Sequence, residues 1–135
     1  MANKIKIKRV TLNIELYLGD SSVIPFQWRE NSTNIIPDDM NYTQFPLVDT
    51  TGMTARLQIK TTPTDTVTLH ESNTTNGEIV LDSANNPNII WNIPEVLTLD
   101  CGVGTFYWDL ETIDSLNEVF TLAGGLVTIF QDVTR

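Results

Sequence analysis

The sequence predicts an all-β protein that folds as a two-layered sandwich, and three observations lead to this prediction. Apolar and polar residues alternate one by one over several short runs, which is typical of strands with one face buried and the other in water. Clusters of Gly, Pro, Asn and Asp, which favour turns, separate these runs. Residues 102–135 are rich in β-branched and aromatic residues and contain no proline, as expected of consecutive strands.

The C-terminal part of the chain is predicted to form three strands joined by two turns. In the first strand, 105–113, Phe106, Trp108 and Leu110 point to one side and the residues between them point to the other. Residues 114–117, with the sequence Asp-Ser-Leu-Asn, supply a turn, because Asp and Asn side chains bond to their own backbone and tolerate left-handed φ angles.

The pair Gly124-Gly125 is predicted to reverse the chain between strands at 119–123 and 126–133, because glycine makes such a turn without a Cβ penalty. The last strand is apolar on both faces, which favours a central position in its sheet. These three strands need other strands to cover them.

Further strands are predicted upstream, each with its inward-facing apolar residues at alternate positions. The most regular is 53–60, where every second residue is apolar. Pro25 lies inside another strand and indicates a sheet edge or a bulge, because proline cannot donate a hydrogen bond to the ladder. Asn76-Gly77 is a hairpin signal. The predicted upstream strands are 10–18, 23–29, 53–60, 66–70, 78–82 and 88–93.

Residues 94–98 are predicted to form one short helical turn, because Pro94 suits the first helical position and Glu95 is favoured near the positive end of a helix. With this turn and about eight or nine short strands, the predicted fold is an immunoglobulin-like antiparallel β-sandwich. A chain of 135 residues is long enough for one such domain, placed at 10–135, with an N-terminal arm at 1–9.

The charge is distributed unevenly along the chain. The arm holds four of the eight Lys and Arg residues, so the rest of the chain has four cations against 17 acidic residues. An acidic body repels phosphate, which argues against nucleic-acid binding. No apolar run approaches the roughly 18 residues of a membrane span, and the first residues lack the features of a secretory signal. Cys101 is the only cysteine, so no intrachain disulfide is expected.

Two segments are candidates for contacts with other proteins. In the arm, Ile alternates with Lys, which suits either a strand added to an acidic neighbour or a solvated terminus. The loop predicted at 30–52 is long for a compact domain, and its apolar residues either fold back over the end of the sandwich or meet another chain. The candidate contact residues are Lys4, Ile5, Lys6, Ile7, Lys8, Arg9, Ile35, Ile36, Tyr42 and Phe45.

The sequence predicts no catalytic residue, no metal site and no cofactor. His70 is the only histidine, has no catalytic motif around it and is expected at an outward strand position. Cys101 is expected to serve as a small buried apolar side chain. Asp38-Asp39 and Asp109 with Glu111 are carboxylate pairs. Asp109 and Glu111 would share one strand face and could hold a hard cation or do acid-base chemistry, but a solvated polar face explains the pairs as well. No glycine-rich nucleotide-binding motif is present.

Several short segments, taken in chain order, carry a resemblance to a known group of proteins. They are Leu18-Gly19-Asp20, Phe26-Gln27-Trp28, the run from Gly52 to Lys60, Gly77-Glu78-Ile79, the run from Ile90 to Pro94, the run from Gly104 to Glu111, Gly125-Leu126-Val127-Thr128 and Val133-Thr134-Arg135. The set resembles small bacteriophage virion proteins with an immunoglobulin-like β-sandwich and is similar to the N-terminal domain of phage baseplate upper proteins. The basic arm and the long loop are departures from that pattern.

This resemblance implies a non-enzymatic virion structural protein, an adaptor or attachment component of the tail, baseplate or tail fibre. It implies other virion proteins as partners, several copies in a symmetric assembly, and a location in the virion after assembly in the cytoplasm of the bacterial host. Neither nucleic acid nor a membrane is expected as a partner. Two alternatives remain open: a capsid decoration (cement) protein, and a carbohydrate-binding module in which the outward aromatic residues Tyr17, Tyr42 or Tyr107 stack on sugar.

Overall fold

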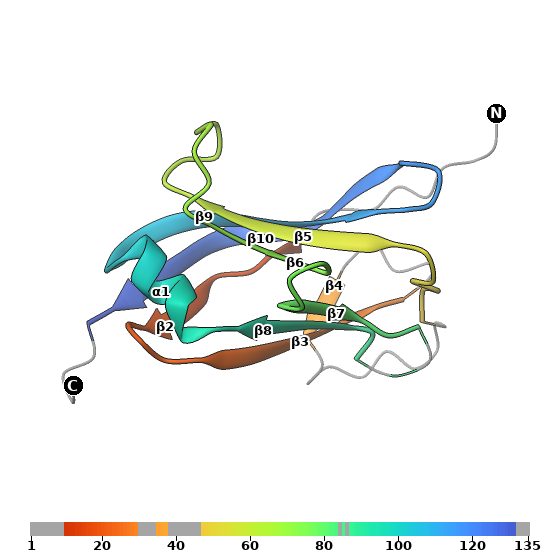
Figure 1. Ribbon diagram of the computed structural model, residues 1–135, viewed down its shortest axis with the longest axis horizontal. Helices are drawn as coiled ribbons and strands as arrows, with labels where there is room; N and C mark the ends of the chain where they lie inside the picture. Colours follow the sequence, from red (N-terminus) through yellow and green to blue (C-terminus); the bar gives the residue numbers. More distant parts are fainter. Residues whose placement is uncertain (1–9, 30–34, 38–46, 84, 86, 132–135) are drawn as a thin grey trace.

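Two β-sheets packed face to face make up the protein, as the predicted sandwich requires (Figure 1). The computed structural model describes residues 10–29, 35–37, 47–83, 85 and 87–131. The elements are β1 (Val10–Thr11), β2 (Ile14–Tyr17), β3 (Ser22–Trp28), β4 (Ile35–Pro37), β5 (Thr54–Lys60), β6 (His70–Asn73), β7 (Ile79–Leu81), β8 (Ile89–Ile93), α1 (Glu95–Cys101), β9 (Gly104–Ile113) and β10 (Val119–Phe130).

The strands divide between the sheets in an immunoglobulin-like order. Sheet A has the order β1-β10-β9-β5-β6, with β2 also paired to β10, and sheet B has the order β4-β3-β8-β7. In chain order, β3, β5, β7, β8, β9 and β10 therefore take the places of the B, C, D, E, F and G strands of an immunoglobulin sandwich. The chain departs from a wholly antiparallel arrangement because β1 and β2 run parallel to β10.

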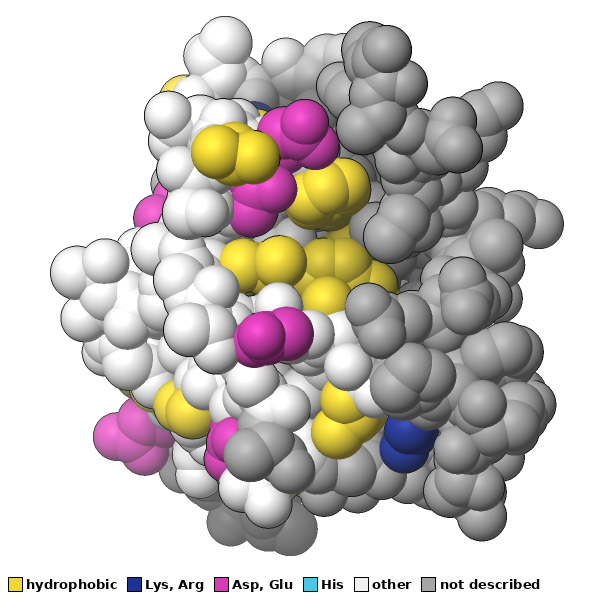
Figure 2. Space-filling model, turned by 90° about the vertical axis from the view of Figure 1, so that its right-hand side faces the viewer, with side chains coloured by type: hydrophobic (Ala, Val, Ile, Leu, Met, Phe, Trp, Pro, Cys, Tyr) yellow, Lys and Arg dark blue, Asp and Glu magenta, His cyan; other side chains and the backbone are white. Residues whose placement is uncertain are grey.

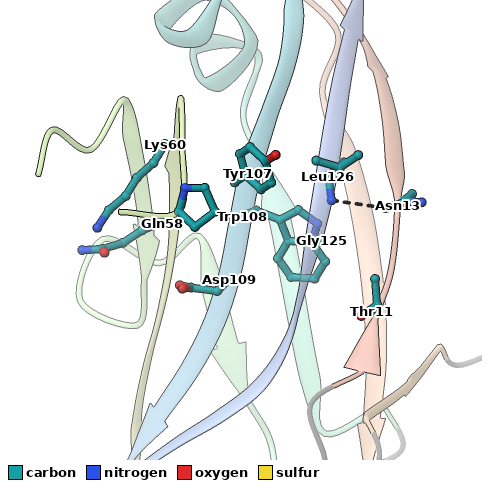
Figure 3. A pocket seen from close by; sticks show the side chains of 10 residues that line it. Thr11, Asn13, Gln58, Lys60, Tyr107, Trp108, Asp109, Gly125 and Leu126 are labelled. Atoms are coloured by element: carbon teal, nitrogen blue, oxygen red, sulfur yellow. Dashed lines mark hydrogen bonds between the residues drawn. The ribbon is translucent and has the colours of Figure 1, made fainter. Parts of the chain in front are cut away.

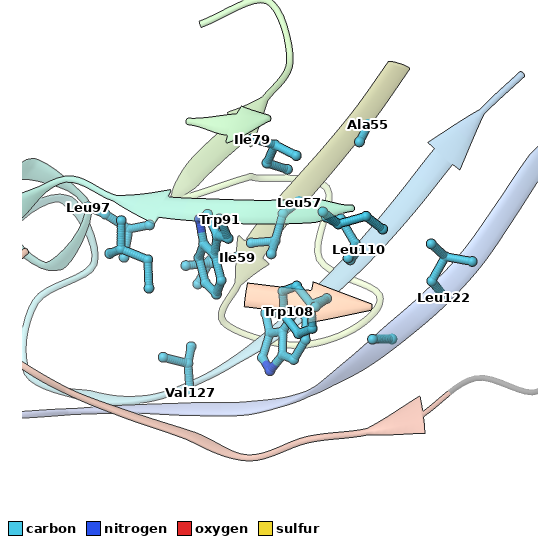
Figure 4. Packing of buried hydrophobic residues seen from close by; sticks show 14 of the residues in the cluster. Ala55, Leu57, Ile59, Ile79, Trp91, Leu97, Trp108, Leu110, Leu122 and Val127 are labelled. Atoms are coloured by element: carbon cyan, nitrogen blue, oxygen red, sulfur yellow. The ribbon is translucent and has the colours of Figure 1, made fainter. Parts of the chain in front are cut away.

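The predicted alternation is confirmed where it is most regular. Along β5, Ala55, Leu57 and Ile59 are buried, and β8 and β9 alternate in the same way. Because side chains alternate across a strand, each of these strands lays one apolar row between the sheets. The buried side chains form a single cluster that fills the space between the two layers (Figure 4).

Two tryptophans join the sheets at the centre of this cluster. Trp91 of sheet B and Trp108 of sheet A stack with ring centroids 5.9 Å apart, and Phe26 lies against Trp108 at 6.5 Å. Each indole also has its polar atom satisfied: Trp91 Nε1 donates to Ser72 Oγ at 2.9 Å and Trp108 Nε1 donates to the Leu12 carbonyl at 3.1 Å. At about 25 cal/mol per Å² of buried apolar surface, burying one tryptophan side chain contributes at most about 6 kcal/mol to the free energy of unfolding.

The predicted chain reversal at Gly124-Gly125 is wrong. Val119–Phe130 forms one continuous strand, β10, with a bulge between Thr121 and Ala123. The glycine serves a close approach rather than a turn, since a Cβ on Gly125 would lie 2.2 Å from the carbonyl oxygen of Leu12. Glycine inside a strand often marks such a place, where another backbone passes nearby. The neighbouring turn at 114–117 is confirmed, with Asn117 at a φ of 64°.

The strand predicted at 10–18 is interrupted at Leu12 and Asn13. Because the Leu12 carbonyl turns toward the Trp108 indole, it leaves the regular ladder with β10. The Asn13 side chain replaces the backbone acceptor that the ladder lacks here: its Oδ1 accepts a hydrogen bond from the Leu126 N–H at 3.2 Å. The core tryptophan therefore breaks the first strand into two short pieces.

Other boundaries also differ from the prediction. The strand expected at 66–70 is wrong, because β6 begins only at His70 and Val67 is 60% exposed. The turn before Gly77 exists, but it carries the chain from sheet A to sheet B instead of closing a hairpin. The helical turn expected at 94–98 extends to Cys101, and the predicted loop at 30–52 contains the edge strand β4.

Pro25 lies where the prediction placed it, at a sheet edge. β4 pairs with β3 only from Phe26 to Trp28, so the first half of β3 has a strand on one side alone among the residues described. The missing proline N–H therefore costs no ladder bond to β4.

No helix in the described ranges is long and apolar enough to cross a membrane.

We expect replacement of Gly125 by alanine to destabilise the protein strongly. The new methyl group would collide with the Leu12 backbone, so the β1 to β2 segment would have to move. Gly77→Ala is the matched control, because Gly77 also has a positive φ, of 81°, but has no heavy atom within 4 Å of the added Cβ. Urea denaturation should show a loss about 1 to 3 kcal/mol larger for Gly125→Ala than for the control. Equal losses would refute the close contact.

Candidate functional site

The predicted arm, residues 1–9, lies outside the described residues, as do Tyr42, Phe45, Asp38 and Asp39. The point where the arm joins the body is described. Val10 begins β1, which pairs in parallel with Ala123 and Gly124 at the edge of sheet A. The arm is thus attached directly to an edge strand.

Ile35 and Ile36, the other predicted contact residues, lie on the edge strand of sheet B. Their backbones pair with Trp28 and Gln27 of β3. The structure therefore does not bring the predicted contact residues into one described site. Ile35 and Ile36 lie on the edge strand of sheet B, and the other predicted contact residues lie outside the described residues.

His70 lies in a polar cluster rather than at the predicted outward position. Its Nδ1 is 2.9 Å from Asp100 Oδ2 of α1, and its Nε2 is 2.7 Å from Glu78 Oε1, just before β7. Ser72 Oγ donates to the same Glu78 oxygen at 2.7 Å and accepts the bond from the Trp91 indole. The cluster closes the side of the sandwich between β6 and β7 and links it to α1.

This cluster does not have the geometry of a Ser-His-Asp triad. In such a triad the serine hydroxyl donates to one ring nitrogen while the carboxylate holds the other. Here both ring nitrogens face carboxylates, and Ser72 is bonded to Glu78 instead. A doubly protonated ring can donate to both carboxylates, whereas a neutral ring can donate to only one. The arrangement serves to join three elements of the fold.

Cys101 is half-buried at the end of α1 and packs against the core, as its predicted apolar role requires. Burial, with a smaller effect from the Asp100 carboxylate, raises the pKa of the Cys101 thiol to about 11. Because the thiolate is the nucleophilic form, this environment suppresses reactivity near neutral pH.

Asp109 and Glu111 share the outer face of sheet A, as predicted. Glu111 pairs with Arg56 of β5 across the strands, at 2.5 Å, and this contact raises the pKa of Arg56. Glu71 of β6 accepts hydrogen bonds from Gln58 and Asn73, which lower the pKa of its carboxyl group. Within the described ranges, no three His, Cys, Asp or Glu side chains are arranged to hold a metal ion.

A groove of about 590 Å³ lies on the outer face of sheet A (Figure 3). Gln58 and Lys60 of β5 lie on one side and Asn13 on the other, with Tyr107 and Asp109 of β9 and Leu126 of β10 between them. The sequence places Tyr107 on an outward face but contains no local signal that four separate segments meet around it. The sequence likewise contains no local signal that the carboxylates of Asp100 and Glu78 meet at His70.

A second exposed feature is the tip of the hairpin between β9 and β10. Both the Leu116 and Glu118 backbone N–H groups donate to Asp114 Oδ1 at 2.9 Å, which fixes the turn. Leu116 is 80% exposed at this tip, followed by the exposed Val119. Figure 2 shows hydrophobic and acidic side chains next to each other on this end of the sandwich.

Comparison with known proteins gives no family assignment. No protein-family model matches the sequence, and no curated protein matches it.

We expect Ser72→Ala to destabilise the protein by about 1 to 3 kcal/mol, because it leaves the buried Trp91 N–H without its acceptor. Thr105→Ala is the control, since its hydroxyl bonds only to Thr128 on an exposed face and its loss should cost less than about 0.5 kcal/mol. Chemical denaturation measures both. If the two variants lose the same stability, the polar cluster does not support the core tryptophan.

Cys101 should react slowly with iodoacetamide in the folded protein at pH 8 and about a hundredfold faster after unfolding in guanidinium chloride. The rate in the folded state should rise steadily as the pH approaches 11, because the thiolate fraction increases. Mass spectrometry of the alkylated chain measures this. Similar rates in the folded and unfolded protein would contradict the burial of the thiol.

Proposed function

We propose that this chain is a non-enzymatic structural subunit of a bacteriophage virion, an adaptor or attachment component of the tail, baseplate or tail fibre. It acts through contacts with other virion proteins and is present in several copies in a symmetric assembly. The ordered resemblance of its segments to small virion proteins supports the phage origin. The immunoglobulin-like sandwich is compatible with it.

The observation that carries the contact role is a part of β10 that has no strand on its outer side among the described residues. β9 pairs with β10 from Val119 to Ile129, but on the other side β1 begins only at Ala123. Within the part of the chain that is described, Val119 to Leu122 therefore have no strand on their outer side. Such an edge offers backbone groups to a strand from a neighbouring chain.

The hairpin tip lies at the same end of the sandwich as this edge. Its turn is fixed by Asp114, so the backbone that carries the exposed Leu116 loses little conformational freedom on binding. An exposed apolar side chain on such a fixed turn is suited to anchor a protein-protein contact. An edge and an anchor together make this end the best candidate for the main contact.

The reactive residues support a role without catalysis. Both nitrogens of His70 are occupied by carboxylates of the fold itself, and the thiol of Cys101 has a raised pKa. Neither residue is poised to attack a substrate.

The test is to purify particles of the phage that encodes this chain and to quantify the protein by mass spectrometry. We expect it in the particle, crosslinked to tail or fibre proteins, with a copy number that follows the rotational symmetry of the tail. A copy number proportional to the capsid subunits would instead identify a decoration protein. Absence from washed particles would end the virion proposal.

Deletion of residues 1–9 separates the contact role from folding. We expect the shortened protein to keep its circular dichroism spectrum and melting temperature but to be incorporated less efficiently. Leu116→Ala should have a similar effect. Val67→Ala should not, because it alters an exposed apolar residue in the connection from β5 to β6, a segment that lies away from this end. Unfolding of the shortened protein would show that the arm belongs to the fold.

A further inference from the structure

The outer face of sheet A carries three exposed aromatic side chains. Leu16, Ile129 and Trp108 point into the core, so their strand neighbours Tyr17, Phe130 and Tyr107 point outward. Tyr17 is 51% exposed, Tyr107 40% and Phe130 38%. Exposed aromatic residues gathered on one face are a frequent sign of a binding surface.

These residues form two groups along β10. Tyr17 lies opposite Phe130 in the ladder, and their rings contact each other with centroids 5.7 Å apart. Tyr107 lies opposite Leu126, four residues earlier on β10. At about 3.3 Å per residue, the two groups are separated by roughly 13 Å along β10. Between them lies an uncharged pair, Thr105 and Thr128, whose hydroxyls are 3.3 Å apart.

The Tyr107 end of this face is the groove described above (Figure 3). Tyr107 and Leu126 give the groove an apolar surface between its two sides, and the sides carry hydrogen-bonding groups of different kinds. Asn13 uses its Oδ1 for the Leu126 N–H, which leaves its amide NH₂ as a donor, and Lys60 and the Tyr107 hydroxyl offer further donors. A volume of about 590 Å³ is within the range of ligand sites.

We propose that this face binds a neutral oligosaccharide, with one sugar stacked on Tyr107 in the groove and another on the Tyr17 and Phe130 pair. Sugar rings present apolar C–H faces that pack on aromatic rings and hydroxyls that bond to amides, phenols and ammonium groups. The roughly 13 Å between the two aromatic groups fits a chain of several sugars rather than a single one. The threonine pair between them supplies hydroxyls along the path.

The charge of the protein decides which carbohydrate is bound. The chain carries a net charge of −9, and Asp109 lies on the groove itself. This field repels polyanions such as nucleic acids and sulfated or sialylated glycans. A ligand without charge avoids the repulsion while keeping the stacking contacts, so neutral glycans are the matching class.

The experiment uses the full chain on a microarray of neutral gluco-, manno-, galacto- and N-acetylglucosamine oligosaccharides, with heparin fragments and sialylated glycans as acidic probes. We expect binding to at least one neutral series and stronger binding to longer members. No binding to any neutral probe at millimolar concentration, or binding to acidic probes alone, would overturn the proposal.

Variants then locate the site by calorimetric titration with the best neutral probe. Tyr107→Ala should weaken binding about tenfold, and Tyr107→Phe, which keeps the ring, should weaken it much less. Tyr17→Ala should weaken binding of long oligosaccharides but leave short ones unchanged. Val80→Ala, on β7 of sheet B, alters an exposed apolar residue away from this face, so it is the matched control and should bind normally. Unchanged affinity in Tyr107→Ala, with its melting temperature intact, would place the binding elsewhere and refute the site.

Discussion

The stacked pair of Trp91 and Trp108 is the contact on which the rest of the structure depends. It joins the two sheets, and its indole N–H groups each need an acceptor because both side chains are buried. Trp108 obtains one by turning the Leu12 carbonyl inward, which splits the first strand and requires glycine at position 125. Trp91 obtains one from Ser72, which is itself held by the polar cluster around His70. Irregularities at two sides of the sandwich thus have a common cause in its centre.

Local sequence patterns were sufficient to predict the fold class and the most regular strands. The alternation of apolar and polar residues along β5, β8 and β9 indicates which side chains enter the core, and this pattern can be read within each strand. The turn at 114–117 was equally predictable, because Asp114 bonds to the backbone that immediately follows it.

The remaining features depend on residues distant in the chain, and no local pattern encodes them. The two carboxylates at His70 come from residues eight and 30 positions away, on different elements. The pair Gly124-Gly125 is typical of a turn. Only the structure shows that Gly125 lies inside a strand, where the Leu12 backbone passes close to it. The groove around Tyr107 likewise exists only after four segments are placed side by side. The predicted contact residues Tyr42 and Phe45 lie outside the described residues and stay predictions.

The parallel pairing of β1 and β2 with β10 has a consequence for how the chain acquires its structure. The bond between Leu126 and Asn13 spans 113 residues, and the ladder from Ile14 to Tyr17 uses the last residues of β10. During synthesis on the ribosome, β1 and β2 therefore stay unpaired until β10, near the end of the described chain, has emerged. Contacts between such distant positions slow folding, and an unpaired strand is prone to aggregate in the meantime. The pairing of β1 and β2 can therefore form only after β10 has been synthesised.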